Sequence, residues 1–303
     1  MDVRELQDVV CAATDDHVDS VARVSGGDVA ESYRMQLASG RVVFAKTHRD
    51  PPPDFFETEA SGLTWLREGV VDGADGRPGV AVPDVVTVGP GHLVLEWIDE
   101  VPSSRAVDAD ERERDLGRGL AALHRSGAPF FGRADRRTTG SRRLPNEPVE
   151  SWPEHFAGNR LVPLAQRWRD TPSLPSPIAD RLVGVADRLD ELGVPDEPAA
   201  RLHGDLWAGN RIVGRRAGER TAMNWLIDPA AHGGHREFDL AMMLLFGGFG
   251  TACFGAYDLE YPLESGWRTR VPLHQLAPLA VHAIKFGGGY VAATDRALDH
   301  VFS

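Results

Sequence analysis

Two short polar segments interrupt hydrophobic sequence in the second half of this 303-residue chain. The first is "RLHGDLWAGNRIVG" at residues 201–214, and the second is "NWLIDPAAHGGHREFDLA" at residues 224–241. A strand-like run precedes a carboxylate in both segments, Asp205 in one and Asp228 in the other, and the first also contains Asn210. The fold therefore has to place these carboxylates after short strands, where a buried charge needs a partner or a chemical role.

Composition limits the classes of protein to which the chain can belong. Its length suffices for one large domain or two lobes, and 42% hydrophobic residues indicate a globular protein. The net charge of −12 argues against a nucleic-acid partner. Cys11 and Cys253 make no disulfide framework and are expected to be ordinary thiols in a reducing cytosol. The N-terminus lacks the basic start and apolar run of a signal peptide, so we expect a cytoplasmic location.

The uncharged segment at residues 240–257 has to be weighed as a membrane span. It has 18 residues, includes four glycines and has no flanking basic residues. A spanning helix needs about 20 predominantly apolar residues and interfacial anchors. We therefore expect no membrane association, and a buried helix that ends at the Gly247-Gly248 pair.

The first hundred residues have the pattern of a β-sheet with one inserted helix. An apolar stripe predicts a first helix at residues 1–22. A second helix is predicted at residues 53–69, with Pro53 and Asp54 at its start and Gly69 at its end. Four strands are predicted from the segments "SYRMQL", "RVVFAKTH", "VPDVVTVG" and "HLVLEWID".

The remainder of the chain is predicted to be mainly helical. The segment "DADERERDLGRGLAALHRSG" is amphipathic, with acids in its first turn. A polar surface loop is predicted at residues 127–150, followed by helices near 153–169 and 176–192. We expect an α+β fold of two lobes with a cleft between them: a small β-rich N-lobe, residues 1–99, and a larger helical C-lobe, residues 100–303.

Lysine is rare in this chain, because its 33 basic residues include only Lys46 and Lys285 as lysines. A site that needs a compact ammonium rather than a planar guanidinium retains Lys. On the helix that follows Lys46, Glu59 falls in the middle of an apolar stripe, where a carboxylate needs a partner. Lys46 on the adjacent strand is the expected partner, although a purely structural ion bridge fits the pattern equally well.

The motifs follow the order found in kinases. A glycine loop, "SGGDVAES", precedes a strand, a turn, the Lys46 strand and the Glu59 helix. Kinases use this order to place backbone N–H groups and a Lys on the phosphates. Asp205 and Asn210 are five residues apart, as in a catalytic loop whose Asp accepts a proton and whose Asn binds a metal. Asp228 is then placed as a Mg²⁺-binding carboxylate; the alternative is a pair of Asp-capped turns.

Further motifs extend over nearly the whole chain, among them "YPLESGWRTRVPLHQLAPLAVH", "KFGGGY", "ETEASGLTWL" and "LGRGLAALHR". With "LHGDLWAGN" and "LIDPAAHGGHREFDLAMMLLFGGF" they resemble the fructosamine-3-kinase (ketosamine-3-kinase) family, which is related to aminoglycoside phosphotransferases. The resemblance implies a protein-kinase-like fold, ATP and Mg²⁺ as cofactors, and phosphorylation of the 3-hydroxyl of a sugar joined to an amine by an Amadori linkage. The unstable product would eliminate phosphate and free the amine, so repair of glycated proteins or amino acids is expected.

The resemblance also implies roles for individual residues. Asp205 would be the base, and Asn210 and Asp228 would bind Mg²⁺. Trp207 would pack against the sugar, with loop packing as its alternative. The phosphates would be held by Lys46, Glu59 and the loop residues Ser25, Gly26 and Gly27. The hinge that meets the adenine would consist of Glu96, Trp97 and Ile98. His203 and His235 would contact the substrate, and Asp239 would brace the catalytic loop.

The sequence departs from the family pattern in two places. Asp28 or a neighbour stands where many members have a cysteine, so redox-linked dimerisation is not expected. The segment "AAHGGHRE" replaces a tyrosine-rich one, which leaves the preferred ketosamine open. His232 and His235 have a spacing that suggests a metal site, but they lack an obvious third ligand. Two rival functions also remain, a kinase of a free amino sugar or other metabolite and an ATP-binding pseudokinase scaffold, and the oligomeric state is not predicted.

Overall fold

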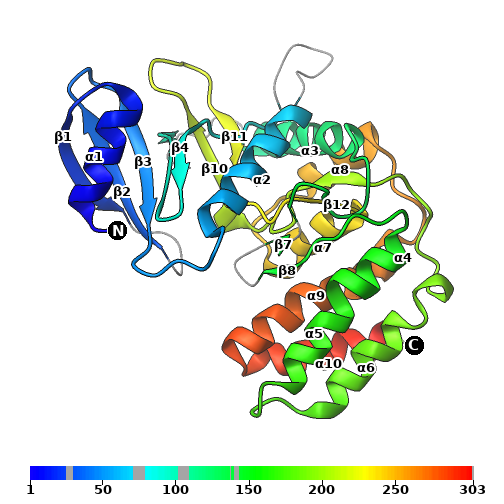
Figure 1. Ribbon diagram of the computed structural model, residues 1–303. Coiled ribbons are helices and arrows are strands. Elements are labelled where there is room, and N and C mark those ends of the chain that lie inside the picture. The colour runs from blue at the N-terminus through cyan, green and yellow to red at the C-terminus, as the bar shows by residue number, and fades with distance from the viewer. Residues whose placement is uncertain (25–29, 71–78, 102–108, 137, 140–142, 302–303) are drawn as a thin grey trace.

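The computed structural model describes residues 1–24, 30–70, 79–101, 109–136, 138–139 and 143–301. Figure 1 shows a β-rich part that contains the N-terminus and a larger, mainly helical part that contains the C-terminal helices. The α+β class predicted from the sequence is therefore confirmed. The glycine-loop residues Ser25, Gly26, Gly27 and Asp28 lie outside the described residues.

The β-rich part is built on a five-stranded antiparallel sheet in the order β1-β2-β3-β5-β4. Alternate residues of a strand point to opposite faces, so Val94 packs with the first helix while Leu93 and Leu95 pack with the second. The elements of this part are α1 (Val3–Thr14), β1 (Val18–Val24), β2 (Glu31–Leu37), β3 (Val42–Thr47), α2 (Phe55–Gly69), β4 (Val85–Gly89) and β5 (His92–Glu96).

The first helix is shorter than the sequence pattern predicts. It begins after Asp2, which forms a capping box with Glu5, and it ends where Asp15 adopts a left-handed conformation with φ of 52°. The end of the predicted helix at residues 1–22 is wrong, because residues 18–24 form β1 and pair with β2. The valines of this strand are β-branched and favour the pleated surface, so their intrinsic preference agrees with a strand although their spacing of three residues also suits a helix.

The helical part also contains the short strands that carry the polar segments. A three-stranded sheet has the order β11-β10-β6, and β9 pairs with β12. The elements of the helical part are β6 (Asp99–Glu100), α3 (Ala109–Arg125), β7 (Thr138–Thr139), β8 (Leu144–Pro145), α4 (Trp152–His155), α5 (Val162–Arg169), α6 (Ser176–Ala186), β9 (Ala200–Leu202), β10 (Arg211–Arg215), β11 (Met223–Leu226), β12 (His232–Gly234), α7 (Glu237–Phe246), α8 (Thr251–Glu260), α9 (Trp267–Phe286) and α10 (Gly289–Val301).

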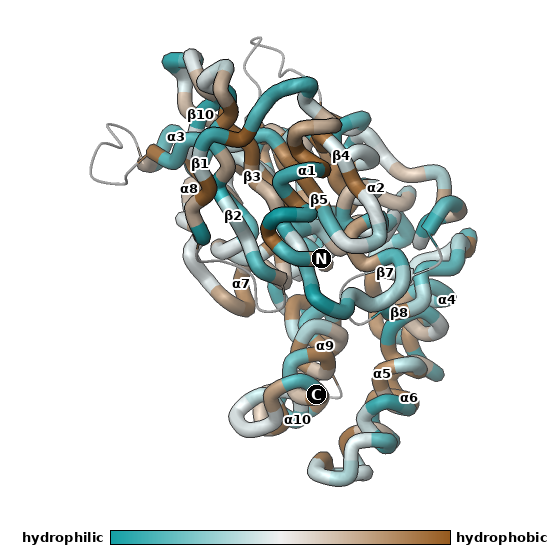
Figure 2. The backbone as a smooth tube through the Cα atoms, turned by 60° about the vertical axis from the view of Figure 1, so that its left-hand side comes forward, coloured by the Kyte–Doolittle hydropathy of each residue, from teal (hydrophilic) through white to brown (hydrophobic). Residues whose placement is uncertain are grey.

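The helices predicted in this part are present with small differences. The one near 153–169 is α4 and α5 joined by a π-helical stretch, Phe156–Leu161. The one near 176–192 is α6 followed by a separate 3₁₀ turn, Leu189–Glu191. Figure 2 shows hydrophilic and hydrophobic residues alternating along α5, α6 and α9, as expected for helices with one face in the core.

A hydrophobic cluster joins the sheet to the helical part and holds the polar segments between them. It contains Phe56 and Leu63 of α2, Leu95 of β5, and Leu206 and Leu226 from the two polar segments. These side chains are almost entirely buried. Because a packed interior resists displacement, Asp205 beside Leu206 and Asp228 just after Leu226 are held at fixed positions relative to α2 and the sheet.

The uncharged segment at residues 240–257 is divided between two helices. Helix α7 ends at Phe246, and Gly247 closes it with φ of 70°, as the Gly-Gly pair predicts. Helix α8 begins at Thr251. Within the described residues, every helix is too short or too polar to cross a membrane.

Candidate active site

Lys46 and Glu59 meet as the sequence predicts. Lys46 lies near the end of β3 and is buried, and Glu59 lies on the face of α2 that also buries Phe56 and Leu63. The Lys46 Nζ donates to Glu59 Oε1 at 2.9 Å. The same ammonium also donates to Oδ1 of Asp228, which follows β11 in the other part of the fold. One lysine thus bridges the sheet, α2 and the second polar segment.

The charges of this group do not balance, because two carboxylates share one ammonium. Burial acts to lower the pKa of Lys46, but the neighbouring Glu59 and Asp228 outweigh it and raise that pKa, so the amine stays charged. Burial, together with the charge of Asp228, raises the pKa of Glu59. The group therefore offsets its excess of negative charge by favouring protonation of Glu59, and a further cation bound here would favour the ionised form of that carboxyl.

Asn210 ties the two polar segments together. Its side-chain Nδ2 donates to the backbone O of Asp205 at 2.9 Å and to Asp205 Oδ2 at 3.2 Å. It also donates to the backbone O of Asp228 at 3.4 Å. With Nδ2 committed to these contacts, the amide oxygen of Asn210 and the carboxylate of Asp228 form a set of hard oxygen donors, which is the type that Mg²⁺ prefers.

Asp228 has an unusual backbone for a residue other than glycine, with φ of 52°. This left-handed conformation is uncommon outside glycine and is several-fold enriched in Asp and Asn. The conformation follows a strand that is buried at Trp225 and Leu226. Local strain of this kind clusters at functional sites, so the observed φ supports a chemical role for this carboxylate.

Asp205 lies in the turn between β9 and β10 with its carboxylate mostly surrounded by protein. Burial raises its pKa to about 7, the negative charge of Asp228 adds to the rise, and the hydrogen bond from Asn210 opposes it. A carboxylate with a pKa near neutrality can take up a proton at physiological pH. Asp205 therefore has the ionisation behaviour that a general base requires.

Asp239 braces this turn from α7, as expected. Its two carboxylate oxygens accept the backbone N–H groups of His203 at 2.8 Å and Gly204 at 2.9 Å. The buried His124 of α3 lies against the same carboxylate, with 3.3 Å between Nε2 and Oδ2. Gly204 itself has φ of +79°, and a Cβ there would lie 2.2 Å from the carbonyl oxygen of Ala230. The turn that carries Asp205 is therefore fixed on two sides.

Trp207 lies at the surface two residues after Asp205, with 41% of its area exposed. Its ring covers Gly209, where an added Cβ would come within 2.2 Å of the ring. It also meets Phe246 at the end of α7 edge to face, with 6.2 Å between ring centroids. An exposed aromatic face beside a candidate base is available to pack against a ligand.

The expected hinge residues have side chains committed to other contacts. The Glu96 carboxylate accepts the backbone N–H of Asp84 at 2.8 Å and pairs with Arg216 at 2.8 Å. Ile98 is buried with Trp225, and the Trp97 ring Nε1 donates to Asp99 at 3.0 Å. A nucleotide base would therefore have to meet the backbone of this segment rather than its polar side chains.

The two histidines expected at the substrate lie in the interior instead of at an exposed surface. The ring of His203 is buried, and its Nε2 contacts the carbonyl oxygen of Ile227 at 2.9 Å. His235 is also buried, and its ring stacks on His274 of α9 with 5.3 Å between centroids. Because both rings are buried, we interpret these histidines as residues that position the loops rather than as residues that contact an acceptor.

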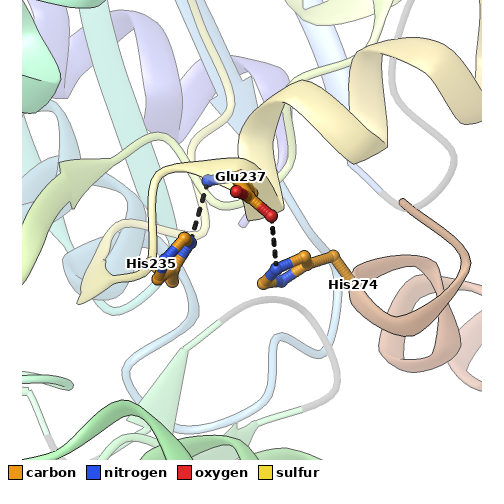
Figure 3. A group of neighbouring side chains, drawn as sticks. All are labelled: His235, Glu237 and His274. Atoms are coloured by element: carbon orange, nitrogen blue, oxygen red, sulfur yellow. Dashed lines mark hydrogen bonds and ion pairs between the residues drawn. The ribbon is translucent and has the colours of Figure 1, made fainter. Parts of the chain in front are cut away.

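His235, Glu237 and His274 form a compact buried group, shown in Figure 3. One potential ligand atom from each lies within 4.8 Å of the others, so the group has the composition of a metal site. Arg270, however, donates to both carboxylate oxygens of Glu237, at 2.9 Å from Nε and through its second nitrogen. Because this guanidinium already neutralises the carboxylate, we interpret the group as an ion-pair network that joins α7 to α9.

Replacement of Arg270 by Met is expected to destabilise the protein by about 3–5 kcal/mol, the usual result of leaving a buried charge without its partner. Burial alone would raise the pKa of Glu237, but His274 and Arg270 outweigh it and lower the pKa to about 2, against an ordinary 4.5. The stabilisation that the ionised Glu237 gains from Arg270 and His274 is therefore present above pH 4.5 and is lost as the pH falls toward 2. Denaturant unfolding at pH 7 measures the loss. Arg268→Met, an exposed neighbour on α9, is the matched control, and equal stability of both variants would contradict this reading.

One further group lies in a motif quoted above, "KFGGGY", but the sequence analysis gave it no role. Lys285, on the last turn of α9, acts on Asp205 through its charge and opposes the rise in the pKa of that carboxylate which burial causes. Two signals were available, the motif that begins at Lys285 and the scarcity of lysine, because both lysines of the chain, Lys46 and Lys285, act on this site.

Comparisons with known proteins agree with this geometry. The fructosamine kinase family model matches residues 4–303. A protein named probable ketoamine kinase from Enterococcus faecium is 32% identical over 285 residues, which cover 92% of this chain and 94% of that protein. A solved structure described as a fructosamine-3-kinase from Thermobifida fusca is 36% identical, has a TM-score of 0.86 and covers 99% of both chains.

A more distant solved structure extends the likeness of the fold. It is a thermostable variant of aminoglycoside phosphotransferase APH(4)-Ia in a ternary complex with AMP-PNP and hygromycin B. It is 11% identical to this chain, with a TM-score of 0.61, and covers 98% of this chain and 97% of its own. At this identity the likeness concerns the fold alone.

The fold and the comparisons together define a phosphotransferase enzyme with a protein-kinase-like architecture, as the sequence predicted. Within that class, the chain belongs to the fructosamine kinase family.

Proposed function

We propose that this protein transfers the γ-phosphoryl group of ATP to the 3-hydroxyl of a ketosamine, a sugar joined to an amine by an Amadori linkage. The observation that carries the proposal is the position of Asp205, whose pKa is near 7. Asp205 shares the Asn210 amide with Asp228 of the Lys46–Glu59–Asp228 group, and it lies two residues before the exposed Trp207. The family supplies the substrate class, because relatives are named as ketoamine and fructosamine kinases.

The proposed roles follow the chemistry of each group. The acceptor oxygen attacks the γ-phosphorus, the bond from that phosphorus to the β,γ-bridging oxygen breaks, and ADP departs. Asp205 takes the proton of the attacking hydroxyl. Mg²⁺, when bound by Asp228 and Asn210, would neutralise charge on the phosphates. Lys46, oriented by Glu59, holds phosphate oxygens, and Trp207 packs against the sugar.

The proposed product explains a role in repair. A phosphate at carbon 3 lies next to the carbonyl at carbon 2 of the ketosamine. Loss of a proton from carbon 1, between that carbonyl and the amine nitrogen, gives an enaminol, which expels the phosphate from carbon 3 and leaves a C=N bond between carbon 1 and the nitrogen. Hydrolysis of the resulting imine-type adduct would free the amine. In this proposal, the lobe at residues 1–99 binds the nucleotide, and the lobe at residues 100–303 supplies the base, the metal ligands and the acceptor site.

A substrate panel tests the proposal. Fructose-lysine and ribulose-lysine are compared with free fructose, ribulose and glucosamine, by ADP release and by the mass of the product. We expect phosphorylation of the ketosamines, followed by loss of phosphate, and little turnover of the free sugars. Phosphorylation of free sugars alone would favour a metabolite kinase, and ATP binding without turnover of any acceptor would favour a pseudokinase scaffold. Asp205→Asn serves as the control for contaminating kinases.

Lys46→Arg is expected to lower kcat/KM for ATP on the order of 10²-fold, because a displacement of about 1 Å costs this much in a positioned site. The ammonium is a compact charge that fits between Glu59 and Asp228, whereas a planar guanidinium is wider. Since the charge is kept, Glu59 retains a partner and the melting temperature should stay close to wild type. Initial rates beside a melting curve measure both. Near-normal turnover would show that Lys46 is only a structural cation.

A further inference from the structure

A continuous row of aromatic rings leads away from the candidate base. Trp207 contacts Phe246 of α7, and Phe246 meets His282 of α9 with 5.0 Å between centroids. His282 in turn meets Phe286 at 5.7 Å and Tyr290 of α10 at 5.0 Å. The two ends of this row are the exposed ones, with 41% of Trp207 and 54% of Phe286 accessible. We call these five residues the aromatic row.

The aromatic row is held against the turn that carries Asp205. Gly248, just after α7, has φ of +85°, and a Cβ there would lie 2.5 Å from the Cβ of Ala208. The backbone that follows Phe246 therefore lies directly on the residue after Trp207. Since Phe246 also contacts α9 through His282, the ends of α7 and α9 form one surface with the candidate catalytic turn.

Lys285 brings a positive charge to this surface. Its Nζ lies over the Phe286 ring, 4.5 Å from the centroid. Burial raises the pKa of Asp205 and the charge of Lys285 opposes that rise, which supports a position for Lys285 near the base as well as beside the aromatic row. The surroundings are otherwise acidic, with Glu59, Asp205 and Asp228 close together in a chain of net charge −12. A cation at this place offsets the repulsion that an anionic acceptor would meet.

We propose that Lys285 and the aromatic row bind the amine-bearing half of the acceptor, and that this half is a free amino acid whose carboxylate pairs with the Lys285 ammonium. The ring faces would cover the apolar atoms beside the sugar, and the Lys285 ammonium would favour acceptors that carry a carboxylate. This inference rests on the proposed function and narrows it. The preferred substrates are then small glycated amino acids rather than glycated side chains within folded proteins.

Two acceptors that differ in one group test the inference. One is fructosyl-valine, linked through the α-amine and carrying a free carboxylate, and the other is its carboxamide. We expect wild type to prefer the carboxylate by about tenfold in kcat/KM, the size of one charge-assisted hydrogen bond. Lys285→Gln should remove this preference mainly by raising KM for the carboxylate, with KM for ATP unchanged, and Lys285→Arg should restore part of it.

Two further variants separate a local contact from a general effect of charge or packing. Arg268→Gln removes a charge from the other end of α9, about 25 Å away at 1.5 Å per residue, and should leave the preference intact. Phe246→Leu, which keeps an apolar side chain but removes the ring, should lower kcat/KM for both acceptors alike. A change in the carboxylate preference with Arg268→Gln would overturn the assignment of the surface. Wild-type kcat/KM for both acceptors with Phe246→Leu would overturn it as well.

The outcomes distinguish this inference from the function on which it rests. If wild type phosphorylates both acceptors equally and Lys285→Gln behaves as wild type, the function stands and the carboxylate site is wrong. If Lys285→Gln instead raises KM for ATP, Lys285 belongs to the nucleotide site and the inference also fails. If wild type phosphorylates neither acceptor but turns over ribulose-lysine or fructose-lysine, only the inference fails. If it phosphorylates none of these ketosamines, the proposed function itself fails.

Discussion

Asp228→Asn is expected to abolish measurable turnover while the chain stays folded. A metal ion contributes several kcal/mol of charge stabilisation in the transition state, which corresponds to at least about 10³-fold in rate. Asn at this position removes the charge that we propose to hold Mg²⁺ but keeps a similar shape. Loss of activity is measured as ADP release at saturating ATP and acceptor.

The fold should survive for two local reasons. Asn tolerates the left-handed backbone seen at Asp228 as well as Asp does, and Lys46 still has Glu59 at 2.9 Å. A melting curve close to wild type is therefore the control for the activity measurement. Ala does not share the tolerance of Asp and Asn for a left-handed backbone. Asp228→Ala would therefore not distinguish unfolding of the chain from loss of the metal-binding charge. Full turnover of wild type in excess chelator, or of Asp228→Asn without it, would exclude the metal role.

The parts of the site that the sequence predicted are those that depend on local pattern. Lys46 and Glu59 are 13 residues apart on a strand and the helix that follows it, so strand order and helical periodicity sufficed to pair them. The contact from Lys46 to Asp228 spans 182 residues and was not predicted, because the likeness to kinases paired Lys46 with Glu59 and assigned Asp228 to the metal.

The parts that the sequence missed depend on packing between distant elements. Nothing in the irregular segment around His235 indicates that its ring is buried against His274, because that contact depends on how α7 and α9 pack. The action of Lys285 on Asp205 depends on the same packing. The first helix was predicted too long for a different reason, since valines at a helical spacing also suit a strand once a partner strand is present.

Asp205→Asn is expected to lower kcat by roughly 10²–10⁴-fold, the usual range for removal of a general base. The substitution is nearly isosteric, and the new amide oxygen can still accept the hydrogen bond that Asn210 gives to Asp205 at 3.2 Å. The backbone of the turn should also stay in place, because Asp239 holds it through the N–H groups of His203 and Gly204. Steady-state rates at saturating substrates measure the effect.

Nucleotide affinity decides which role Asp205 has. In our proposal the phosphates are held by Lys46 and by the metal at Asp228 and Asn210, none of which changes in Asp205→Asn. The dissociation constant for an ATP analogue, measured by calorimetry in the presence of Mg²⁺, should therefore remain within a few-fold of wild type. If the affinity collapses while kcat holds, Asp205 is a metal ligand, and the proton of the acceptor must be taken up by another group or by solvent.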